Sequence, residues 1–209
     1  MSLLAVRELA AERGFRVLFT GVGFALDPGS ALVLTGPNGS GKTTLLRLLA
    51  GFARPLAGEI LWQDEPIDRD LEAHRQRVAY VGHLAGIKPS LTPREQLGFE
   101  ARVREGSVEA AIERLRLGSF ADLPIALLSA GQRRRTALAR LLLGDAPLWL
   151  LDEPTTSLDA EGEAALWGLA REHLAGGGLV VLASHGTVPL AGAQHLALAA
   201  VPPAEAAAA

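Results

Sequence analysis

The chain has no cysteine among its 209 residues. This absence excludes disulfide bonds and thiolate metal ligands, and it is compatible with a reducing compartment. The sequence also lacks any uncharged apolar run of the ~18 residues that a membrane-spanning helix needs. Its most apolar region, residues 138–151, is interrupted by Arg140 and Asp145. We therefore expect a soluble protein, or one that is bound to a membrane only through a partner.

A strong excess of charge is missing as well. The formal net charge is −3, so the charge balance does not predict broad binding to nucleic acid. Arg7 and Glu8 interrupt the apolar residues near the N-terminus, which argues against a secretory signal. Apolar residues make up 49% of the chain and charged residues 21%, and this composition predicts a packed globular protein.

Apolar runs typical of strands alternate with helical patterns along most of the chain. This alternation predicts an α/β fold with a mainly parallel central sheet. Glycine and proline between residues 14 and 28 indicate an antiparallel β portion before the main sheet, whereas residues 86–126 show only helical patterns. The strands are expected at residues 16–19, 31–35, 59–62, 78–81, 148–151, 179–183 and 195–198, and the helices at residues 42–50, 93–104, 108–116, 132–143 and 161–174.

These patterns predict a single domain, residues 1–209, with an insertion. The α/β core and its β portion are expected at residues 1–85 and 127–203, and a helical subdomain at residues 86–126. The tail at residues 204–209 reads AEAAAA, and its low complexity predicts disorder.

Residues 36–43 read GPNGSGKT, which matches the P-loop pattern G-x-x-x-x-G-K-[ST]. The motif follows the apolar strand ALVLT and opens the helical stretch TLLRLLAG, as the pattern requires. Its glycines allow successive N–H groups to point at one anion, and the helix N-terminus adds positive charge. The alternative is a glycine-rich turn that only caps a helix. The predicted nucleotide-binding residues are Gly36, Pro37, Asn38, Gly39, Ser40, Gly41, Lys42, Thr43 and Thr44, with Lys42 at the terminal phosphates and Thr43 on Mg²⁺.

Residues 148–153 read LWLLDE, an apolar strand that ends in two acids. The carboxyl edge of a parallel sheet is where open α/β folds bind ligands. Asp152 is therefore the predicted second ligand of Mg²⁺, and Glu153 can polarise the water that attacks the γ-phosphate of ATP. The alternative is a strand that ends at the surface with two solvated acids, and the P-loop argues against it.

Three further stretches narrow the class of P-loop protein. Residues 128–132 read LSAGQ, residues 155–159 read TTSLD, and residues 183–185 read ASH at the end of another apolar strand. LSAGQ resembles the signature motif of ATP-binding cassette (ABC) ATPases, usually LSGGQ, with Ala130 in place of one glycine. TTSLD resembles the D-loop of that family, and ASH resembles its switch-histidine loop. The resemblance extends over essentially the whole chain.

The resemblance implies the ABC ATPase fold and ATP hydrolysis. In this family the signature contacts the γ-phosphate of an ATP held by the other subunit, so a head-to-tail dimer with two ATPs is implied. The alternative for LSAGQ is an ordinary capped helix start. The three arginines at residues 133–135 are predicted to form a solvated helix face. The implied signature residues are Ser129, Ala130, Gly131 and Gln132, and the D-loop residue is Asp159.

Two more nucleotide contacts are implied. His185 would lie beside the γ-phosphate, although a structural histidine at a strand end is the alternative. The family usually has an aromatic residue upstream that stacks on adenine. The matching place falls near Arg13, with Phe15 two residues on, and a guanidinium plane or a phenyl ring could stack there. Three other histidines are predicted to be surface or structural residues: His74, His173 and His195.

One loop indicates a narrower group. Where the family normally has a glutamine, in the loop that faces the membrane subunit, this chain has His83. The stretches GHLAGIKPSLTPREQL, GPNGSGKTTLLRLLAG and LPIALLSAGQRRRTALARL resemble the ATP-binding subunits of the cytochrome c maturation haem exporter, the CcmA family. The resemblance implies a peripheral ATPase on the cytoplasmic face of the inner membrane, with a membrane-spanning subunit and cytochrome c maturation proteins as partners. Contacts with the transported species are expected on another polypeptide.

Three alternatives stay open. The first is the ATPase of another small bacterial ABC exporter. The second is a soluble ABC ATPase that acts on ribosomes or DNA, but such proteins generally carry two cassettes or a long coiled-coil insertion. The third is a non-hydrolysing nucleotide-binding scaffold, against which Glu153 argues. The expected ligands are ATP and Mg²⁺, and no nucleic acid is expected.

We predict that His83→Gln retains ATPase activity, whereas His83→Ala uncouples ATP hydrolysis from cytochrome c maturation. A neutral histidine can accept a hydrogen bond through one ring nitrogen and donate through the other, as an amide group can, and alanine can do neither. The measurements are the ATPase rate and the amount of mature cytochrome c in cells. Normal maturation with the alanine variant would mean that His83 is only packed structure.

Overall fold

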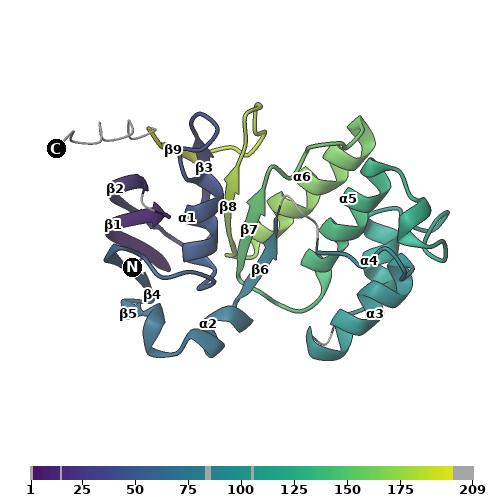
Figure 1. Cartoon of the computed structure of the whole chain (residues 1–209). Helices are drawn as coiled ribbons and strands as arrows, with labels where there is room; N and C mark the ends of the chain where they lie inside the picture. The colour runs from purple at the N-terminus through teal and green to yellow at the C-terminus, as the bar shows by residue number, and fades with distance from the viewer. Residues whose placement is uncertain (1, 15, 83–85, 105, 200–209) are drawn as a thin grey trace.

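The computed structural model describes residues 2–14, 16–82, 86–104 and 106–199, and its strands form two sheets (Figure 1). Phe15, His83 and the tail at residues 204–209 lie outside the described residues. The antiparallel sheet has the order β2-β1-β4-β5, with β1 Leu4–Arg13, β2 Arg16–Leu26, β4 Ala57–Trp62 and β5 Glu65–Pro66. The parallel sheet has the order β6-β7-β8-β3-β9, with β6 Val78–Val81, β7 Leu148–Asp152, β8 Leu179–Ala183, β3 Ala31–Thr35 and β9 Gln194–Ala197.

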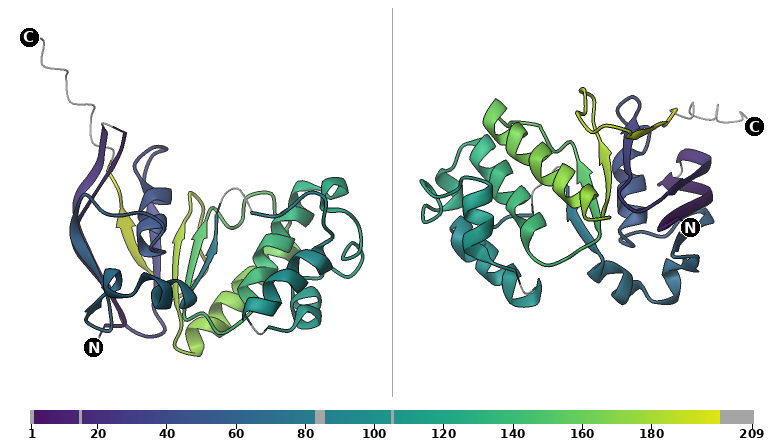
Figure 2. Two further views of the ribbon diagram at one scale, coloured as in Figure 1. Left: turned by 60° about the horizontal axis from the view of Figure 1, so that its bottom comes forward. Right: turned by 180° about the vertical axis from the view of Figure 1, so that it is seen from behind.

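The helices lie in two groups on either side of the parallel sheet. Figures 1 and 2 show α1 between this sheet and the antiparallel sheet, with α3 to α6 on the opposite side. This arrangement buries both faces of the parallel sheet, as parallel sheets require. The helices are α1 Lys42–Leu49, α2 Leu71–Gln76, α3 Pro93–Arg104, α4 Val108–Arg114, α5 Ala130–Ala139 and α6 Ala160–Ala175, with short 3₁₀ turns at Ile67–Arg69, Ile125–Leu127 and Arg140–Leu142.

The side chains of β3 show how the core is divided. Successive side chains of a strand point to opposite faces. Leu32 and Leu34 belong to the apolar cluster that includes Leu46 of α1, whereas Val33 belongs to the cluster that includes Leu166 of α6. The residue that follows this doubly buried strand is Gly36, so the P-loop begins at the carboxyl edge of the sheet.

The predicted fold class is confirmed, with a mainly parallel sheet, an antiparallel portion near the N-terminus, and helices between residues 86 and 126. The strand β1 was not among the expected strands. Its alternation is broken where Glu8 takes a φ of 47° and the pairing register shifts between Arg7 and Ala10. Gly58 lies opposite, and a Cβ there would stand 2.4 Å from the carbonyl oxygen of Arg7. A bulge of this kind removes the period-two signal of a strand.

His74 is a fully buried residue of α2, so it is structural. Its Nε2 donates a hydrogen bond to the carbonyl oxygen of Leu49 at 2.7 Å, and its buried Nδ1 has no partner among the described residues. Burial lowers the pKa of His74 from its usual value near 6.5, and this effect outweighs the raising effect of the Leu49 bond. Protonation would place a charged and unpaired N–H in the core.

We predict that stability falls as pH drops through about 6.5, because the unfolded state then binds a proton that folded His74 resists. The folded pKa is the lower one, so the loss continues until pH reaches that value. His74→Leu should have a smaller dependence on pH, although it is less stable at neutral pH. Urea unfolding between about pH 5 and pH 7.5 measures both effects.

His195→Gln, which changes an exposed histidine on β9, is the control. Some dependence on pH should remain in His74→Leu, because burial also lowers the pKa of His173, which stacks on Trp149. An unchanged dependence in His74→Leu would contradict the assignment.

Candidate functional site

The P-loop joins β3 to α1, and its backbone needs glycine. Gly41 has a φ of 100°, and a Cβ there would lie 2.8 Å from the ring of Phe19. At Gly36, with a φ of 134°, a Cβ would lie 2.3 Å from the carbonyl oxygen of Leu198. These positions combine left-handed backbone with close packing, so they exclude any side chain. The loop is thereby held against β2 and the segment after β9.

Lys42 begins α1 and is only 8% exposed. Its Nζ donates hydrogen bonds to the carbonyl oxygens of Gly36 at 2.7 Å and Pro37 at 3.2 Å. These bonds fold the side chain back over the start of the loop. Ser40 is fully buried under the loop, and its Oγ has no hydrogen-bond partner among the described residues. Together these residues form a positively polarised cradle suited to phosphate.

Thr43 and Asp152 meet across the sheet edge. The Thr43 hydroxyl donates to Oδ2 of Asp152 at 2.7 Å, and Asp152 is 2% exposed at the end of β7. A hydroxyl and a carboxylate are the hard oxygen donors that Mg²⁺ prefers. Within the described residues, no group of three or more His, Cys, Asp or Glu side chains could hold a metal ion alone. The pair therefore fits a magnesium ion whose other ligands are phosphate oxygens and water.

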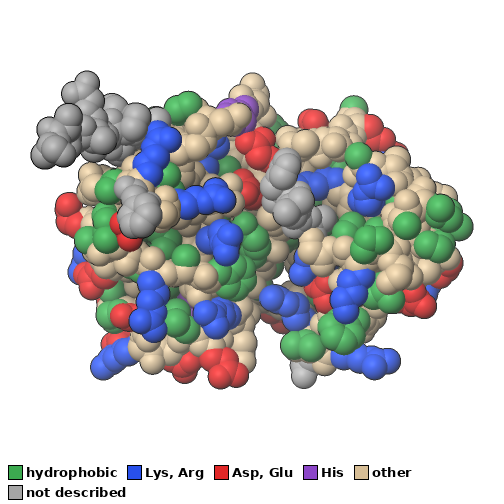
Figure 3. Space-filling view, in the orientation of Figure 1, with side chains coloured by type: hydrophobic (Ala, Val, Ile, Leu, Met, Phe, Trp, Pro, Cys, Tyr) green, Lys and Arg blue, Asp and Glu red, His purple; other side chains and the backbone are tan. Residues whose placement is uncertain are grey.

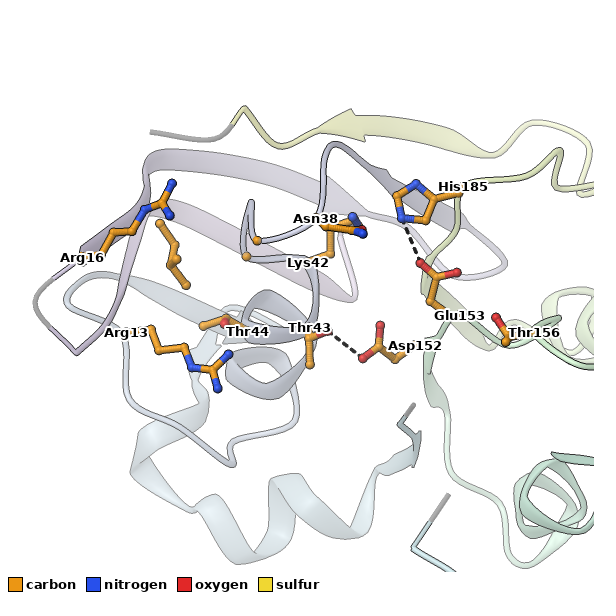
Figure 4. A pocket seen from close by; sticks show the side chains of 13 residues that line it. Arg13, Arg16, Asn38, Lys42, Thr43, Thr44, Asp152, Glu153, Thr156 and His185 are labelled. Atoms are coloured by element: carbon orange, nitrogen blue, oxygen red, sulfur yellow. Dashed lines mark hydrogen bonds and ion pairs between the residues drawn. The ribbon is translucent and has the colours of Figure 1, made fainter. Parts of the chain in front are cut away.

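Glu153 and His185 face each other from neighbouring strand ends (Figure 4). Nε2 of His185 lies 3.2 Å from Oε1 of Glu153. Glu153 has a φ of 51°, an unfavourable conformation for a residue with a Cβ, and its N–H bonds to the carbonyl oxygen of Ala183 at 3.0 Å. Strained residues of this kind cluster at functional sites. The Glu153 carboxylate points towards His185, and both side chains line the same cleft as the P-loop (Figure 4).

These residues line one cleft of about 640 Å³. Figure 4 shows Arg13 and Arg16 on the side of this cleft away from Glu153 and His185. Lys and Arg side chains are visible over the surface around β1, β2 and α1 in Figure 3, which suits a polyanionic ligand. The cleft is lined by Arg13, Arg16, Leu18, Asn38, Gly39, Gly41, Lys42, Thr43, Thr44, Asp152, Glu153, Thr156 and His185.

The cleft contains most of the predicted nucleotide-binding residues, and Arg13 is among them. Phe15, the other candidate for adenine stacking, and His83 lie outside the described residues. Sequence reasoning missed Arg16, Leu18 and Thr156. Arg16 could have been inferred, because a hairpin that places Arg13 at a cleft also brings the first residues of the returning strand there.

The signature residues form a different site. Ser129 caps α5, since its Oγ accepts from the N–H of Gln132 at 3.2 Å while Oε1 of Gln132 accepts from the N–H of Ser129 at 2.9 Å. Ala130 is exposed at the first position of this helix. Ser129, Gly131 and Gln132 line a pocket of about 570 Å³ that shares no lining residue with the nucleotide cleft. One copy of the chain therefore does not bring its own signature to its own P-loop.

Asp159 belongs to this second pocket. Its carboxylate caps α6 by accepting from the N–H of Gly162 at 2.9 Å, and Oδ2 accepts from Arg135 at 2.6 Å. The Gly162 bond and then the Arg135 guanidinium hold the pKa of Asp159 below its usual value. A Cβ on Gly131 would lie 2.7 Å from the carbonyl oxygen of Ser157, so the signature and the D-loop pack directly against each other.

The prediction of a solvated arginine face at residues 133–135 is wrong. Arg134 is 6% exposed, and its guanidinium donates to main-chain carbonyl oxygens at the ends of β6 and β7. Arg135 pairs with Asp159. The helical turn of α5 directs Arg134 to the same inner side as buried Leu138, one turn further on.

Comparison with known proteins supports the same chemistry. The chain matches the family model described as ABC transporter over residues 19–156. It is 47% identical, over 94% of each chain, to a protein of Paramagnetospirillum magneticum named cytochrome c biogenesis ATP-binding export protein CcmA. A Rhodospirillum rubrum protein of the same name is 48% identical over 94% of this chain and 86% of that protein. A Salmonella choleraesuis protein named bifunctional cytochrome c-type biogenesis protein CcmAE is 46% identical over 90% of this chain and 56% of its own length.

Solved structures have the same fold. An ABC transporter ATP-binding protein from Pyrococcus furiosus superposes with a TM-score of 0.79 at 22% identity, covering 93% of this chain and 96% of that chain. A dimeric ATP-binding cassette, in a post-hydrolysis state with ADP and Pi, superposes with a TM-score of 0.74 at 25% identity over 88% of each chain.

We predict that Arg13→Ala raises the KM for ATP about two- to fivefold and leaves kcat nearly unchanged. Stacking of a guanidinium on a base at an exposed site contributes about 0.5–1 kcal/mol, and it acts equally on the ground state and the transition state. Steady-state ATPase kinetics measures both constants. Arg7→Ala is the matched control, because Arg7 lies on the same strand, pairs with Glu59 and does not line the cleft. An effect of Arg16→Ala alone would move the stacking role to Arg16.

Proposed function

This chain belongs to the ABC transporter family, among the CcmA ATP-binding export proteins of cytochrome c biogenesis, and from this premise we propose that its ATPase activity drives haem export through a membrane-spanning partner. The observation that supports the ATPase chemistry best is the meeting of Thr43, Asp152, Glu153 and His185 beside the P-loop. Two strand ends and one helix start supply all four side chains.

The polar groups beside the P-loop have distinct roles in the proposed hydrolysis. The loop N–H groups and Lys42 bind the β- and γ-phosphates. Glu153 accepts a proton from the attacking water as the new P–O bond forms, and the bond from the γ-phosphorus to the β-phosphate oxygen breaks to release ADP. His185 lies beside Glu153 at the end of β8, where its N–H would donate to the γ-phosphate. Mg²⁺, held by Thr43 and Asp152, would neutralise charge on the phosphate oxygens.

We propose that two copies act together. The pocket of Ser129, Gly131 and Gln132 is separate from the nucleotide cleft, so a second copy is needed to bring a signature onto each ATP. A head-to-tail arrangement with two-fold symmetry completes both sites at once. A solved cassette of this fold, with ADP and Pi, is dimeric, which supports the pairing of two copies.

The membrane partner would cover an apolar surface beside α3. Phe99 and Val103 lie one turn apart on this helix and are 64% and 80% exposed. Exposed apolar side chains that gather on one face mark interaction surfaces. No helix in the described residues is long and apolar enough to span a bilayer, so the pathway would be supplied by another polypeptide. Attachment at the cytoplasmic face of the inner membrane follows, because ATP is available there.

The name of one relative supports a further cytochrome c biogenesis protein as a partner. The CcmAE protein joins a CcmA-like half to a second half within one chain. Joined halves are expected to work side by side, so a further biogenesis protein is a reasonable partner for this chain. Haem is the proposed cargo because the biogenesis of cytochrome c requires it.

We predict that Glu153→Gln lowers the rate of ATP hydrolysis about 100-fold or more, because the variant cannot take a proton from water. ATP binding should persist, since the P-loop is unchanged, and the variant should accumulate as an ATP-bound dimer.

Tagged Glu153→Gln should then recover a membrane-spanning subunit and cytochrome c biogenesis proteins from solubilised membranes. The measurements are ATPase rate, size-exclusion mass with ATP, and mass spectrometry of the recovered proteins.

Glu59→Gln, on the exposed surface of β4, is the control for loss of a carboxylate. Unchanged turnover in Glu153→Gln would contradict the assignment of Glu153 as the general base. Recovery of an unrelated permease would assign the ATPase to another exporter and contradict the haem proposal, while leaving the ATPase chemistry intact.

A further inference from the structure

Arg134 is a buried cation that none of the proposed catalytic steps uses. Its Nη2 donates to the carbonyl oxygens of Asp152 at 2.7 Å and Glu153 at 2.8 Å, and its Nε donates to that of Pro154 at 3.1 Å. Its Nη1 donates to the carbonyl oxygen of Gly82 at 2.8 Å. All four partners are main-chain atoms, and the guanidinium forms no ion pair with a side chain among the described residues.

This placement is costly for a purely structural residue. Burial lowers the pKa of Arg134 from its usual value, while the nearby carboxylates of Asp152 and Glu153 oppose that shift. A guanidinium nevertheless stays charged in proteins, so its desolvation has to be offset by the carbonyl dipoles and by the charges nearby. An apolar side chain would fill the same space without that cost. The position therefore needs the charge and the fork of donors.

Three consecutive carbonyl groups explain why this position needs a charged group with several N–H donors. The carbonyl groups of Asp152, Glu153 and Pro154 all reach one guanidinium, so they point inward together at the place where β7 ends. Aligned carbonyl oxygens repel one another unless a cation lies between them. Glu153 has a φ of 51° within this turn, which is strained for a side chain with a Cβ. The guanidinium supplies the interaction that holds the strained turn.

The fourth bond ties this turn to β6. Gly82 directly follows β6, and a Cβ there would lie 2.9 Å from the ring of Tyr80, so the backbone is closely packed at this point. Arg134 therefore fixes two neighbouring strand ends to the inner side of α5. Its neighbour Arg133 instead donates to the carbonyl oxygen of Leu128, close to the start of its own helix.

We propose that Arg134 is a positioning residue for hydrolysis. By binding the carbonyl oxygens of Asp152, Glu153 and Pro154, it holds the turn that aims the Glu153 carboxylate at the attacking water. Through its bond to Gly82, it fixes that turn to the end of β6. The inference rests on the proposed role of Glu153 as the base. It assigns no contact between Arg134 and the nucleotide.

The test is a double-mutant cycle between Arg134→Met and Glu153→Gln. Arg134→Met removes the charge and the donors but keeps a long side chain, so kcat should fall about tenfold or more, whereas the KM for ATP should change by less than about threefold. In the Glu153→Gln background the same substitution should cause little further loss, because Arg134 acts through Glu153. Arg134→Lys, which keeps the charge but not the fork, should have an intermediate kcat.

Arg104→Met is the matched control, because Arg104 is another partly buried arginine that donates to a carbonyl of β6, that of Val78 at 3.1 Å. It lies at the other end of the strand, and kcat should stay within about twofold of the wild-type value. Thermal unfolding and ATP-binding calorimetry on every variant separate a change in folding from a change in turnover.

The possible results distinguish the positioning role of Arg134 from the proposed role of Glu153 as the base. An unchanged kcat in folded Arg134→Met overturns the positioning role, even if Glu153→Gln is inactive and the proposed function stands. Equal losses in both backgrounds would also overturn it, because Arg134 would then act independently of Glu153. If Arg134→Met and Arg134→Lys both unfold or lose ATP binding, Arg134 is structural and the inference fails. Full ATPase activity of Glu153→Gln would instead contradict the proposed role of Glu153 as the base.

Discussion

The hydrogen bond between Thr43 and Asp152 joins the two halves of the site, and the rest of the cleft is arranged around it. It links the start of α1, which follows β3, to the end of β7. Between these strands in the sheet lies β8, whose carboxyl end leads to His185. Parallel strands bring their carboxyl ends to one edge, so segments more than 100 residues apart meet there without any long loop. The site is therefore a consequence of strand order.

This constraint explains which parts of the protein could be predicted. The P-loop and the acidic strand end are local patterns whose neighbours already identify them as strand, turn and helix, and in the structure both lie at the carboxyl edge of the parallel sheet. By contrast, β1 was not recognised, because the bulge at Glu8 breaks its alternation and Gly58 of a distant strand makes room for it. Three adjacent arginines carry no periodic signal, so the sequence alone favours a solvated position for Arg134, whereas its carbonyl partners depend on how α5 packs. The conformation of β1 and the position of Arg134 both depend on tertiary contacts.

The helix α5 serves two sites with two different surfaces. Its N-terminus, capped by Ser129, opens onto the pocket that would receive the other copy's ATP. One turn later, Arg134 points inward and binds the strand end that carries this copy's Glu153. A rigid helix cannot move its first turn without moving its second. In the proposed two-fold dimer, contact of the signature with one nucleotide would thus be mechanically connected to Glu153, the proposed base for the other.

Two buried cations, Lys42 and Arg134, both bind main-chain carbonyl oxygens, and their chemistry suits opposite tasks. Lys42 has a single ammonium group on a flexible stem, so its bonds to Gly36 and Pro37 can be exchanged for bonds to phosphate oxygens. Arg134 has a planar fork whose bonds reach four carbonyls at once, and no single partner can leave without disturbing the others. An ammonium group therefore suits a ligand that binds and is released again. A guanidinium is fitted to a turn that must keep its shape through every cycle of hydrolysis.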